Sequence, residues 1–193
     1  MVNKITNAKI IQLYLNDYKR AYYLRELADN LKKPHQTIKP YVEELVEKQI
    51  LIKIERKNLI EYKLNIKDSR VTNYLVIAEK ERLIERIEKD ALFHMLFEDF
   101  APELKNNTFV IFGSGAHEFK KGSDIDILII GKKKIPKIIE KFEIVSNKEL
   151  HVVQIPNLKS LTHSLAIEIL RKHLILNNTE QIILFFLEVN QIS

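Results

Sequence analysis

The chain of 193 residues contains no cysteine, no tryptophan and only four glycines. Without cysteine, neither disulfide bonds nor thiolate-bound metal sites can form, which fits a reducing compartment. No apolar run approaches the ~20 residues that a helix needs to cross a bilayer, and the segment from Met1 to Asp17 lacks the continuous apolar core of a signal peptide. We therefore expect a cytoplasmic protein with no membrane partner.

Most of the chain carries no net charge, and the net positive charge is confined to its N-terminal third. Residues 1–68 contain 14 Lys or Arg and 9 Asp or Glu, a surplus of five, whereas residues 69–193 contain 17 of each. The whole formal charge of +5 therefore belongs to the N-terminal third. A localised surplus of this kind is typical of a nucleic-acid-binding module. A solvated lysine-rich face is the alternative, and charge alone does not decide between them.

The first block, residues 1–67, is predicted to contain three helices and a hairpin. Apolar residues recur at helical spacing in three segments, and two alternating runs then flank a tight polar turn. Pro40 lies inside the third helix, where it predicts a distortion. The expected helices begin at Asn7 as the cap, span Leu24–Leu31, and run from Pro34 to about Lys48, and the expected strands are Ile50–Arg56 and Leu59–Leu64.

This element order resembles that of the winged helix-turn-helix family, over roughly residues 5–65. The Leu24-x-x-Leu27-Ala28 core of the second helix and the stretch leading into the hairpin carry the same resemblance. It implies that the third helix enters the major groove of double-stranded DNA, where Gln and Thr meet base edges and Lys meets phosphates. A dimerisation or partner-docking module is the alternative. The implied DNA-binding residues are Lys33, His35, Gln36, Thr37, Lys39, Lys53, Arg56 and Lys57.

The rest of the chain divides into residues 68–104 and residues 105–193. The first of these is predicted to be a long amphipathic helical linker, which packs on the next domain or forms the seam of a homodimer. The second alternates strands with helices, which indicates an α/β domain. Its expected strands are Thr108–Phe112, Ile125–Ile130, Phe142–Val145 and Glu149–Ile155, and its expected helices are Ile135–Lys141, Ser160–Lys172 and Thr179–Val189.

The most informative motif is Gly113-Ser114, followed after nine residues by Asp124-Ile125-Asp126. Alternate residues of a strand share a face, so the two aspartates are expected to project from the same side. Like charges a few ångströms apart repel unless a cation lies between them. Mg²⁺ is usually held by one or two carboxylates together with phosphate oxygens. Gly113 allows a close approach of backbone to ligand, and Ser114 offers a hydroxyl and an N–H group.

At these residues the chain resembles the minimal nucleotidyltransferases of the DNA polymerase β-type superfamily. The signature of these proteins is an apolar strand, Gly-Ser, a loop of about this length, and Ser-Asp-x-Asp leading into a second strand. The chain matches it at Gly113, Ser114, Ser123, Asp124 and Asp126, within a resemblance over about residues 105–190. The stretch 168–178 is similar to the tail of winged-helix-fused members found mainly in archaea. The resemblance implies an α+β nucleotidyltransferase fold, a mixed sheet with flanking helices.

The resemblance also implies a mechanism. Asp124 and Asp126 would bind Mg²⁺, while Gly113, Ser114 and Ser123 would hold a nucleoside triphosphate, with ATP the expected one. An acceptor hydroxyl would attack the α-phosphate and pyrophosphate would leave, a reaction that depends on positioning and charge neutralisation.

Two features depart from the family pattern. Active members carry a third carboxylate on a later strand, and Glu149 is the candidate for a catalytic residue and metal ligand. Strand alternation puts Glu149 and His151 on one face, and if register gives His151 that position, the second metal site is impaired. His117 and Glu118 also replace the usual Arg-Gly of the loop, which removes a permanent cation near the phosphates.

The sequence is compatible with two functions. The first is a Mg²⁺-dependent nucleotidyltransferase, coupled to DNA binding, that transfers a nucleoside monophosphate to a hydroxyl of a protein, small molecule or nucleic acid. Small family members can act as antitoxins that modify a partner toxin. The second is a DNA-binding transcriptional regulator whose nucleotidyltransferase-like domain is inactive or senses nucleotide. The intact aspartate pair favours the first function, and the altered loop and third acid favour the second.

Overall fold

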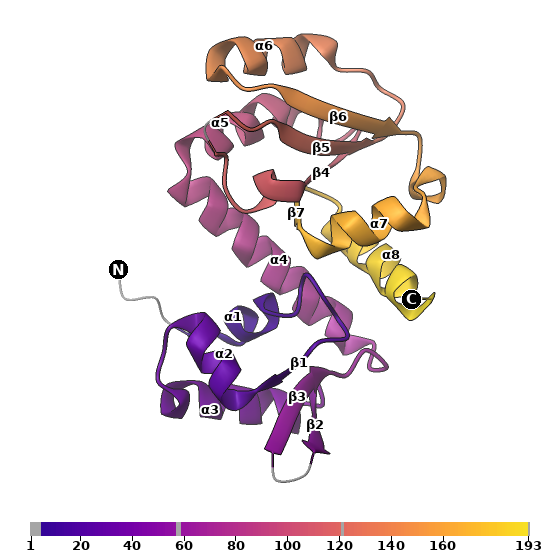
Figure 1. The fold of residues 1–193 in the computed structure, drawn as a ribbon. Coiled ribbons are helices and arrows are strands. Elements are labelled where there is room, and N and C mark those ends of the chain that lie inside the picture. Colours follow the sequence, from indigo (N-terminus) through magenta and orange to yellow (C-terminus); the bar gives the residue numbers. More distant parts are fainter. Residues whose placement is uncertain (1–4, 57–58, 121, 193) are drawn as a thin grey trace.

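A long helix, α4 (Arg70–Lys89), connects the two halves of the molecule (Figure 1). The computed structural model describes residues 5–56, 59–120 and 122–192. The 20 residues of α4 include neither proline nor glycine, and its buried side chains include Val71, Leu75 and Leu83. Because these side chains lie on a helix between the two blocks, α4 contributes to the core of both.

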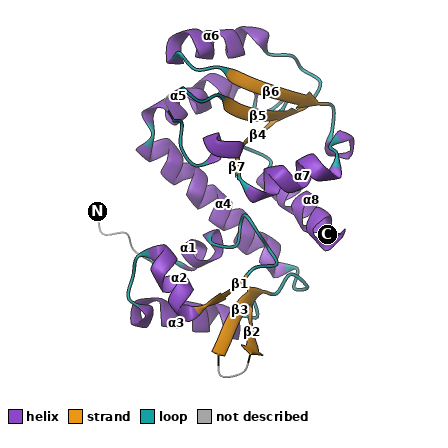
Figure 2. Ribbon diagram, viewed as in Figure 1, coloured by secondary structure: helices purple, strands orange, loops and turns teal. Residues whose placement is uncertain are grey.

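The N-terminal block consists of three helices and a three-stranded antiparallel sheet of order β1-β3-β2 (Figure 2). The predicted second helix and second strand of the hairpin have the bounds expected from sequence. Thr6 rather than Asn7 caps the first helix, because its hydroxyl accepts the N–H of Lys9 at 3.2 Å. The elements are α1 (Asn7–Gln12), β1 (Ala21–Tyr23), α2 (Leu24–Leu31), α3 (His35–Glu47), β2 (Leu51–Arg56) and β3 (Leu59–Leu64).

The C-terminal block is built on a mixed four-stranded sheet of order β6-β5-β4-β7. Strand β4 is antiparallel to β5 and β7, whereas β5 and β6 are parallel and are joined through α6. The elements are α5 (Ala91–Phe100), η1 (Ala101–Glu103), β4 (Thr108–Phe112), η2 (Gly113–Ala116), β5 (Ile125–Ile130), α6 (Pro136–Ser146), β6 (Leu150–Ile155), η3 (Leu158–Ser160), α7 (His163–Arg171), β7 (His173–Ile175) and α8 (Thr179–Ile192).

Helices cover both faces of this sheet, so the fold is mixed α/β. One face packs on α5 and α6 through side chains such as Phe93 and Phe142. The other face packs on α7 and α8 through Ile169 and Phe186. The strand predicted at Phe142–Val145 is wrong, because these residues lie in α6. Phe142 is buried at helical spacing from the half-buried apolar residues of the same helix, and this packing overrides the strand preference of β-branched residues.

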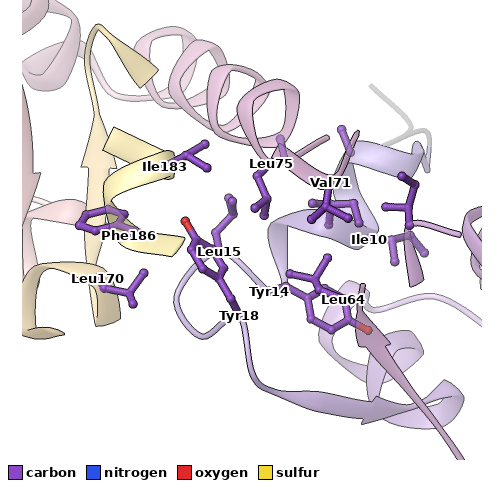
Figure 3. Packing of buried hydrophobic residues seen from close by; sticks show 14 of the residues in the cluster. Ile10, Tyr14, Leu15, Tyr18, Leu64, Val71, Leu75, Leu170, Ile183 and Phe186 are labelled. Carbon is purple, nitrogen blue, oxygen red and sulfur yellow. The ribbon is translucent and has the colours of Figure 1, made fainter. Parts of the chain in front are cut away.

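The two blocks share one continuous hydrophobic core (Figure 3). Leu15 and Tyr18, from the segment that follows α1, are fully buried beside Leu170, Ile183 and Phe186 of α7 and α8. This packing fixes the N-terminal block against the helices that support the sheet. Within the part of the chain that the structure describes, no helix is both long and apolar enough to cross a membrane.

Candidate functional site

One end of the C-terminal sheet carries a row of aligned residues from all four strands. Asp126 on β5 pairs with Phe112 on β4 and with His151 on β6, and Phe112 in turn pairs with His173 on β7. Aligned residues on neighbouring strands project from the same face of a sheet. Ile125, next to Asp126, is buried in the core formed with α5 and α6, so Asp126 belongs to the opposite face.

The Gly113 turn lies directly against the carboxylate of Asp126. Gly113 has a φ of +64°, and a Cβ atom added to it would lie only 2.5 Å from Asp126 Oδ2. Glycine is therefore required here twice, for its backbone conformation and for the close approach. The backbone N–H of Gly113 donates to the carbonyl of Lys172 at 3.1 Å, which ties the turn to β7. The first part of the predicted motif thus touches the second.

A pocket of about 540 Å³ opens beside Asp124. The structure brings the predicted residues Asp124 and Glu149 to this one pocket, and both are exposed. Of its remaining lining residues, only His151 was considered from sequence, as the alternative to Glu149. The remaining lining residues are Glu143, Asn147, Lys148, Leu150 and His151.

Two of these unexpected residues hold the walls of the pocket in position. Lys148 Nζ donates to the carbonyl of Lys120 and, at 3.3 Å, to that of Ser123, so the loop before Asp124 is tied to the start of β6. Glu143 Oε1 accepts the backbone N–H of Leu150 at 2.8 Å. Both side chains are therefore engaged in supporting the backbone around the pocket.

His151, not Glu149, is the neighbour of Asp126 in the sheet. His151 Nδ1 lies 3.0 Å from Asp126 Oδ1, and the histidine side chain is 67% exposed. Glu149 comes one residue before β6, where its carbonyl accepts the N–H of Ile125 at 3.0 Å. Across the described ranges, no three His, Asp or Glu side chains gather closely enough to hold a metal ion. The roles of Glu149 as metal ligand and catalytic residue stay predictions.

The donors at the turn fit one Mg²⁺ that arrives with phosphates. Asp126 offers an oxygen beside Gly113, and Asp124 comes two residues earlier in the chain and lines the neighbouring pocket. Two carboxylates with phosphate oxygens are a usual Mg²⁺ environment, which needs no cage made only of protein ligands. A second metal ion would need Glu149 or His151 to complete its coordination, and imidazole suits other metals better than Mg²⁺.

The two predicted serines differ in their surroundings. Ser114 is exposed on the short turn η2. The hydroxyl of Ser123 donates to the carbonyl of Lys120 at 2.9 Å, so this serine holds the loop in shape. Partial loss of hydration, together with the nearby cations Arg82, Lys172, Arg86 and His173, lowers the pKa of His117. The neutral ring adds no cation to the loop near neutral pH.

The predicted DNA-binding residues that the structure describes lie before and in the first turns of α3 and on β2, and most of them are exposed. Ile38 is fully buried, and the residues around it at the start of α3 face solvent. Lys33 is half-buried, and Arg56 pairs with Glu61 at 3.1 Å. Lys57 lies outside the described residues. The exposed candidates are His35, Gln36, Thr37, Lys39, Lys53 and Arg56.

The later turns of α3 have the opposite charge. Glu47 is exposed there and Glu43 and Glu44 are partly exposed, and Lys39 lies 3.7 Å from Glu43. Phosphates repel carboxylates, so contact with DNA would be confined to the first turns of α3 and to the β2–β3 hairpin.

Comparisons with known proteins add little beyond this geometry. No family model and no curated protein matches the chain. A solved structure described as the toxin–antitoxin MntA–HpeT mutant is similar at 15% sequence identity, with a TM-score of 0.41. The similarity covers 51% of this chain and 84% of that chain. A similarity with so low an identity and TM-score supports no conclusion about function. The description of the site therefore rests only on its residues and their contacts.

Proposed function

We propose that the C-terminal block is a Mg²⁺-dependent nucleotidyltransferase that transfers a nucleoside monophosphate to a hydroxyl. One observation carries the proposal, namely the contact between the Gly113 turn and Asp126. A Cβ atom at Gly113 would overlap Asp126 Oδ2 at 2.5 Å. A carboxylate pressed against a glycine turn, with a second aspartate two residues away, is the juxtaposition that a metal-bound triphosphate requires.

Each residue then has a stated task. The backbone of the Gly113-Ser114 turn and the Ser114 hydroxyl bind the β- and γ-phosphates, and Asp124 and Asp126 hold the Mg²⁺, which supplies charge neutralisation when bound. The acceptor oxygen forms a bond to the α-phosphorus, the bond to the bridging oxygen breaks, and pyrophosphate leaves. Glu149, exposed in the pocket beside Asp124, takes the acceptor proton.

The N-terminal block is proposed to be a winged helix-turn-helix that binds double-stranded DNA. Three helices followed by the β2–β3 hairpin support this assignment, as does the surplus of five positive charges in residues 1–68. The exposed start of α3 supplies Gln36 and Thr37 for base edges. The protein would then bring nucleotidyl transfer to a DNA site or respond to that site.

A second function is favoured by the position of His151. The ring lies 3.0 Å from Asp126, and if this is the position of the third acid in active members of the resembled family, the second metal site is impaired. A site with one cation can bind nucleotide without the second metal that assists transfer. The protein would then be a DNA-binding transcriptional regulator that senses nucleotide.

Label transfer separates the two functions. The protein is incubated with Mg²⁺, ATP labelled on the α-phosphate and a clarified lysate as the source of acceptors, and incorporated label is measured. We expect label with the native chain, at least a tenfold loss with Asp126→Asn, and a similar loss with Glu149→Gln. The matched control is Glu140→Gln, an exposed glutamate on α6. Equal labelling by the native chain and Asp126→Asn would reject the transferase.

The DNA assignment has its own test, the salt dependence of binding to duplex DNA. Removal of one lysine–phosphate pairing reduces the slope of log affinity against log salt by ~0.9, so Lys33→Ala with Lys39→Ala and Lys53→Ala should reduce it by up to about 2.7. The matched control replaces three exposed lysines of the other block, Lys132, Lys134 and Lys137. If both triple variants have the same slope, the predicted interface is wrong.

A further inference from the structure

A charged cluster is buried where the two blocks meet. Glu79 of α4 and His173 of β7 are both fully buried, and His173 Nε2 lies 2.6 Å from Glu79 Oε1. Arg82 Nη2 lies 2.6 Å from the same oxygen. Burial raises the pKa of the Glu79 carboxyl, but Arg82 and His173 outweigh it and the pKa is lowered. Glu79 is therefore a carboxylate.

Both ring nitrogens of His173 face oxygen atoms. Its Nδ1 lies 2.8 Å from the carbonyl oxygen of Leu170, and a carbonyl can only accept a hydrogen bond. Its Nε2 faces the Glu79 carboxylate, which also only accepts. His173 is therefore held between two acceptors, the carbonyl of Leu170 and the side chain of Glu79. Arg82 and His173 thus converge on one oxygen of the same buried carboxylate.

Direct contacts lead from this cluster to both blocks. Toward the N-terminal block, Arg82 Nη1 donates to Asn16 Oδ1 at 3.3 Å. Toward the Gly113-Ser114 turn, Arg82 Nη2 donates to the carbonyl of His173 at 2.7 Å. His173 pairs with Phe112, the residue before Gly113, and the adjoining carbonyl of Lys172 accepts the Gly113 N–H. A chain of direct contacts therefore connects the Gly113-Ser114 turn through His173 and Arg82 to Asn16.

Two polar atoms in and beside the cluster make no hydrogen bond. Among the described residues, the Tyr18 hydroxyl and Glu79 Oε2 are buried without a hydrogen-bond partner. Tyr18 is fully buried in the shared core, and its pKa is raised, first by burial and then by the charge of Glu79. Leaving a buried polar atom without a partner is unfavourable. A second arrangement, in which the Tyr18 hydroxyl donates to Glu79 Oε2, would satisfy both atoms at once.

We propose that Glu79, Arg82 and His173 are positioning residues that couple the Gly113-Ser114 turn to the N-terminal block, and that the Tyr18 hydroxyl, which has no partner in this structure, gains Glu79 Oε2 as its acceptor in the second arrangement. Nucleotide at the turn then alters the affinity of the N-terminal block for DNA, and DNA alters the affinity for nucleotide by the same factor. This coupling rests on the proposed function, because it needs both ligands to bind.

The coupling is measured as a ratio of affinities. Binding of a fluorescent mixed-sequence DNA duplex is titrated with and without Mg²⁺ and an ATP analogue that cannot be cleaved between the α- and β-phosphates. Binding of the analogue is titrated with and without DNA. Couplings between sites are typically about 5- to 150-fold, so we expect at least a fivefold ratio, equal in the two titrations.

Tyr18→Phe is the decisive variant, because it removes only the hydroxyl that lacks a partner. It should fold at least as stably as the native chain, bind each ligand alone within about twofold, and reduce the coupling ratio to near one. Glu79→Gln should also reduce the ratio. The matched control is Tyr22→Phe, whose hydroxyl donates to the carbonyl of Leu13 away from the cluster.

Each outcome has a distinct meaning. A ratio near one in the native chain, with both ligands binding, overturns the coupling and leaves the proposed function standing. A native ratio that survives in Tyr18→Phe overturns the proposed role of the Tyr18 hydroxyl. Absence of any analogue binding overturns the proposed function, and the coupling with it. A ratio that disappears in Tyr18→Phe and is kept in Tyr22→Phe supports the proposal, since a merely structural role would not separate these two variants.

Discussion

At the scale of single residues, Gly113 defines the candidate site. Its φ of +64° belongs to a region that other residues rarely enter, and the space where a Cβ would lie is filled by Asp126 Oδ2. Gly122 offers a matched comparison, because its φ is +75° and nothing lies within 4 Å of the Cβ position. The two glycines therefore share the backbone requirement and differ only in the contact.

The pair gives a sharp prediction. Gly113→Ala and Gly122→Ala should each lose ~1–2 kcal/mol of stability from the left-handed backbone conformation. Only Gly113→Ala should also displace the Asp126 carboxylate and weaken Mg²⁺–nucleotide binding, by tenfold or more. Calorimetric titration and urea unfolding measure the two effects. Equal nucleotide affinity in the two variants would mean that the contact with Asp126 does not matter for binding.

Glu79 gives a pH-dependent prediction at the same scale. Its pKa is lowered in the folded protein relative to its ordinary value of 4.5. Stability from a lowered carboxyl pKa is fully present above the unfolded value and is lost as pH falls through the folded one. The stability difference between the native chain and Glu79→Gln should therefore be largest near neutral pH and shrink below about pH 4.5. Urea unfolding across this range measures it, and a difference that grows on acidification would contradict the prediction.

At the scale of elements, Asp90 separates two helices that were expected from sequence to form one helical segment. Its backbone is extended, and its Oδ1 accepts the N–H groups of Leu92 and Phe93 at 3.0 Å each. The same side chain pairs with Arg86 at the end of α4. A strong N-cap thus ends one helix and starts the next, which turns α5 onto the sheet.

Loss of this cap should be measurable. Asp90→Ala should reduce the free energy of unfolding by ~1 kcal/mol, within the range of ~0.5–2 kcal/mol for N-cap removal. Asp90→Asn keeps an accepting oxygen and loses the charge that faces Arg86, so it should cost less. Chemical denaturation of the three proteins tests the order. An alanine variant as stable as the native chain would show that the cap does not hold the α4–α5 corner.

The elements also show what sequence can predict. Strands β4 and β5 have the predicted bounds, because fully apolar runs flanked by turn residues are a strong signal. Strands β1 and β7 have three residues each, too short for a periodic pattern, and were missed. The register between β5 and β6 could not be predicted from sequence either, because the pairing of Asp126 with His151 depends on how α6 returns the chain to the sheet. The aspartate pair was therefore predictable, whereas the choice between Glu149 and His151 as the neighbour of Asp126 was not.

At the scale of the whole molecule, the shared core should make the two blocks unfold together. All seven tyrosines lie in residues 14–74, so tyrosine fluorescence reports on the N-terminal block and the start of α4. Phe186 of α8 is buried in the shared core, whereas Leu184 of the same helix is 46% exposed. A probe in one block can thus detect a change made in the other.

Phe186→Ala should lower stability by ~3–5 kcal/mol and shift the tyrosine transition together with the far-ultraviolet circular dichroism transition. Leu184→Ala, the matched control, should change stability by ~0.5 kcal/mol or less. Separate transitions, with tyrosine fluorescence unmoved by Phe186→Ala, would show that the blocks fold independently. That result would also remove the physical basis for coupling between them.

The proposed chemistry depends above all on one point, that the Gly113 turn and the aspartate pair form a single Mg²⁺–nucleotide site. Isothermal titration with ATP and Mg²⁺ tests it on the native chain and on the Asp124→Asn, Asp126→Asn double variant. We expect saturable binding that depends on Mg²⁺ in the native chain and is weakened at least tenfold in the variant. Equal affinity in the two proteins, or affinity that does not depend on Mg²⁺, would contradict it.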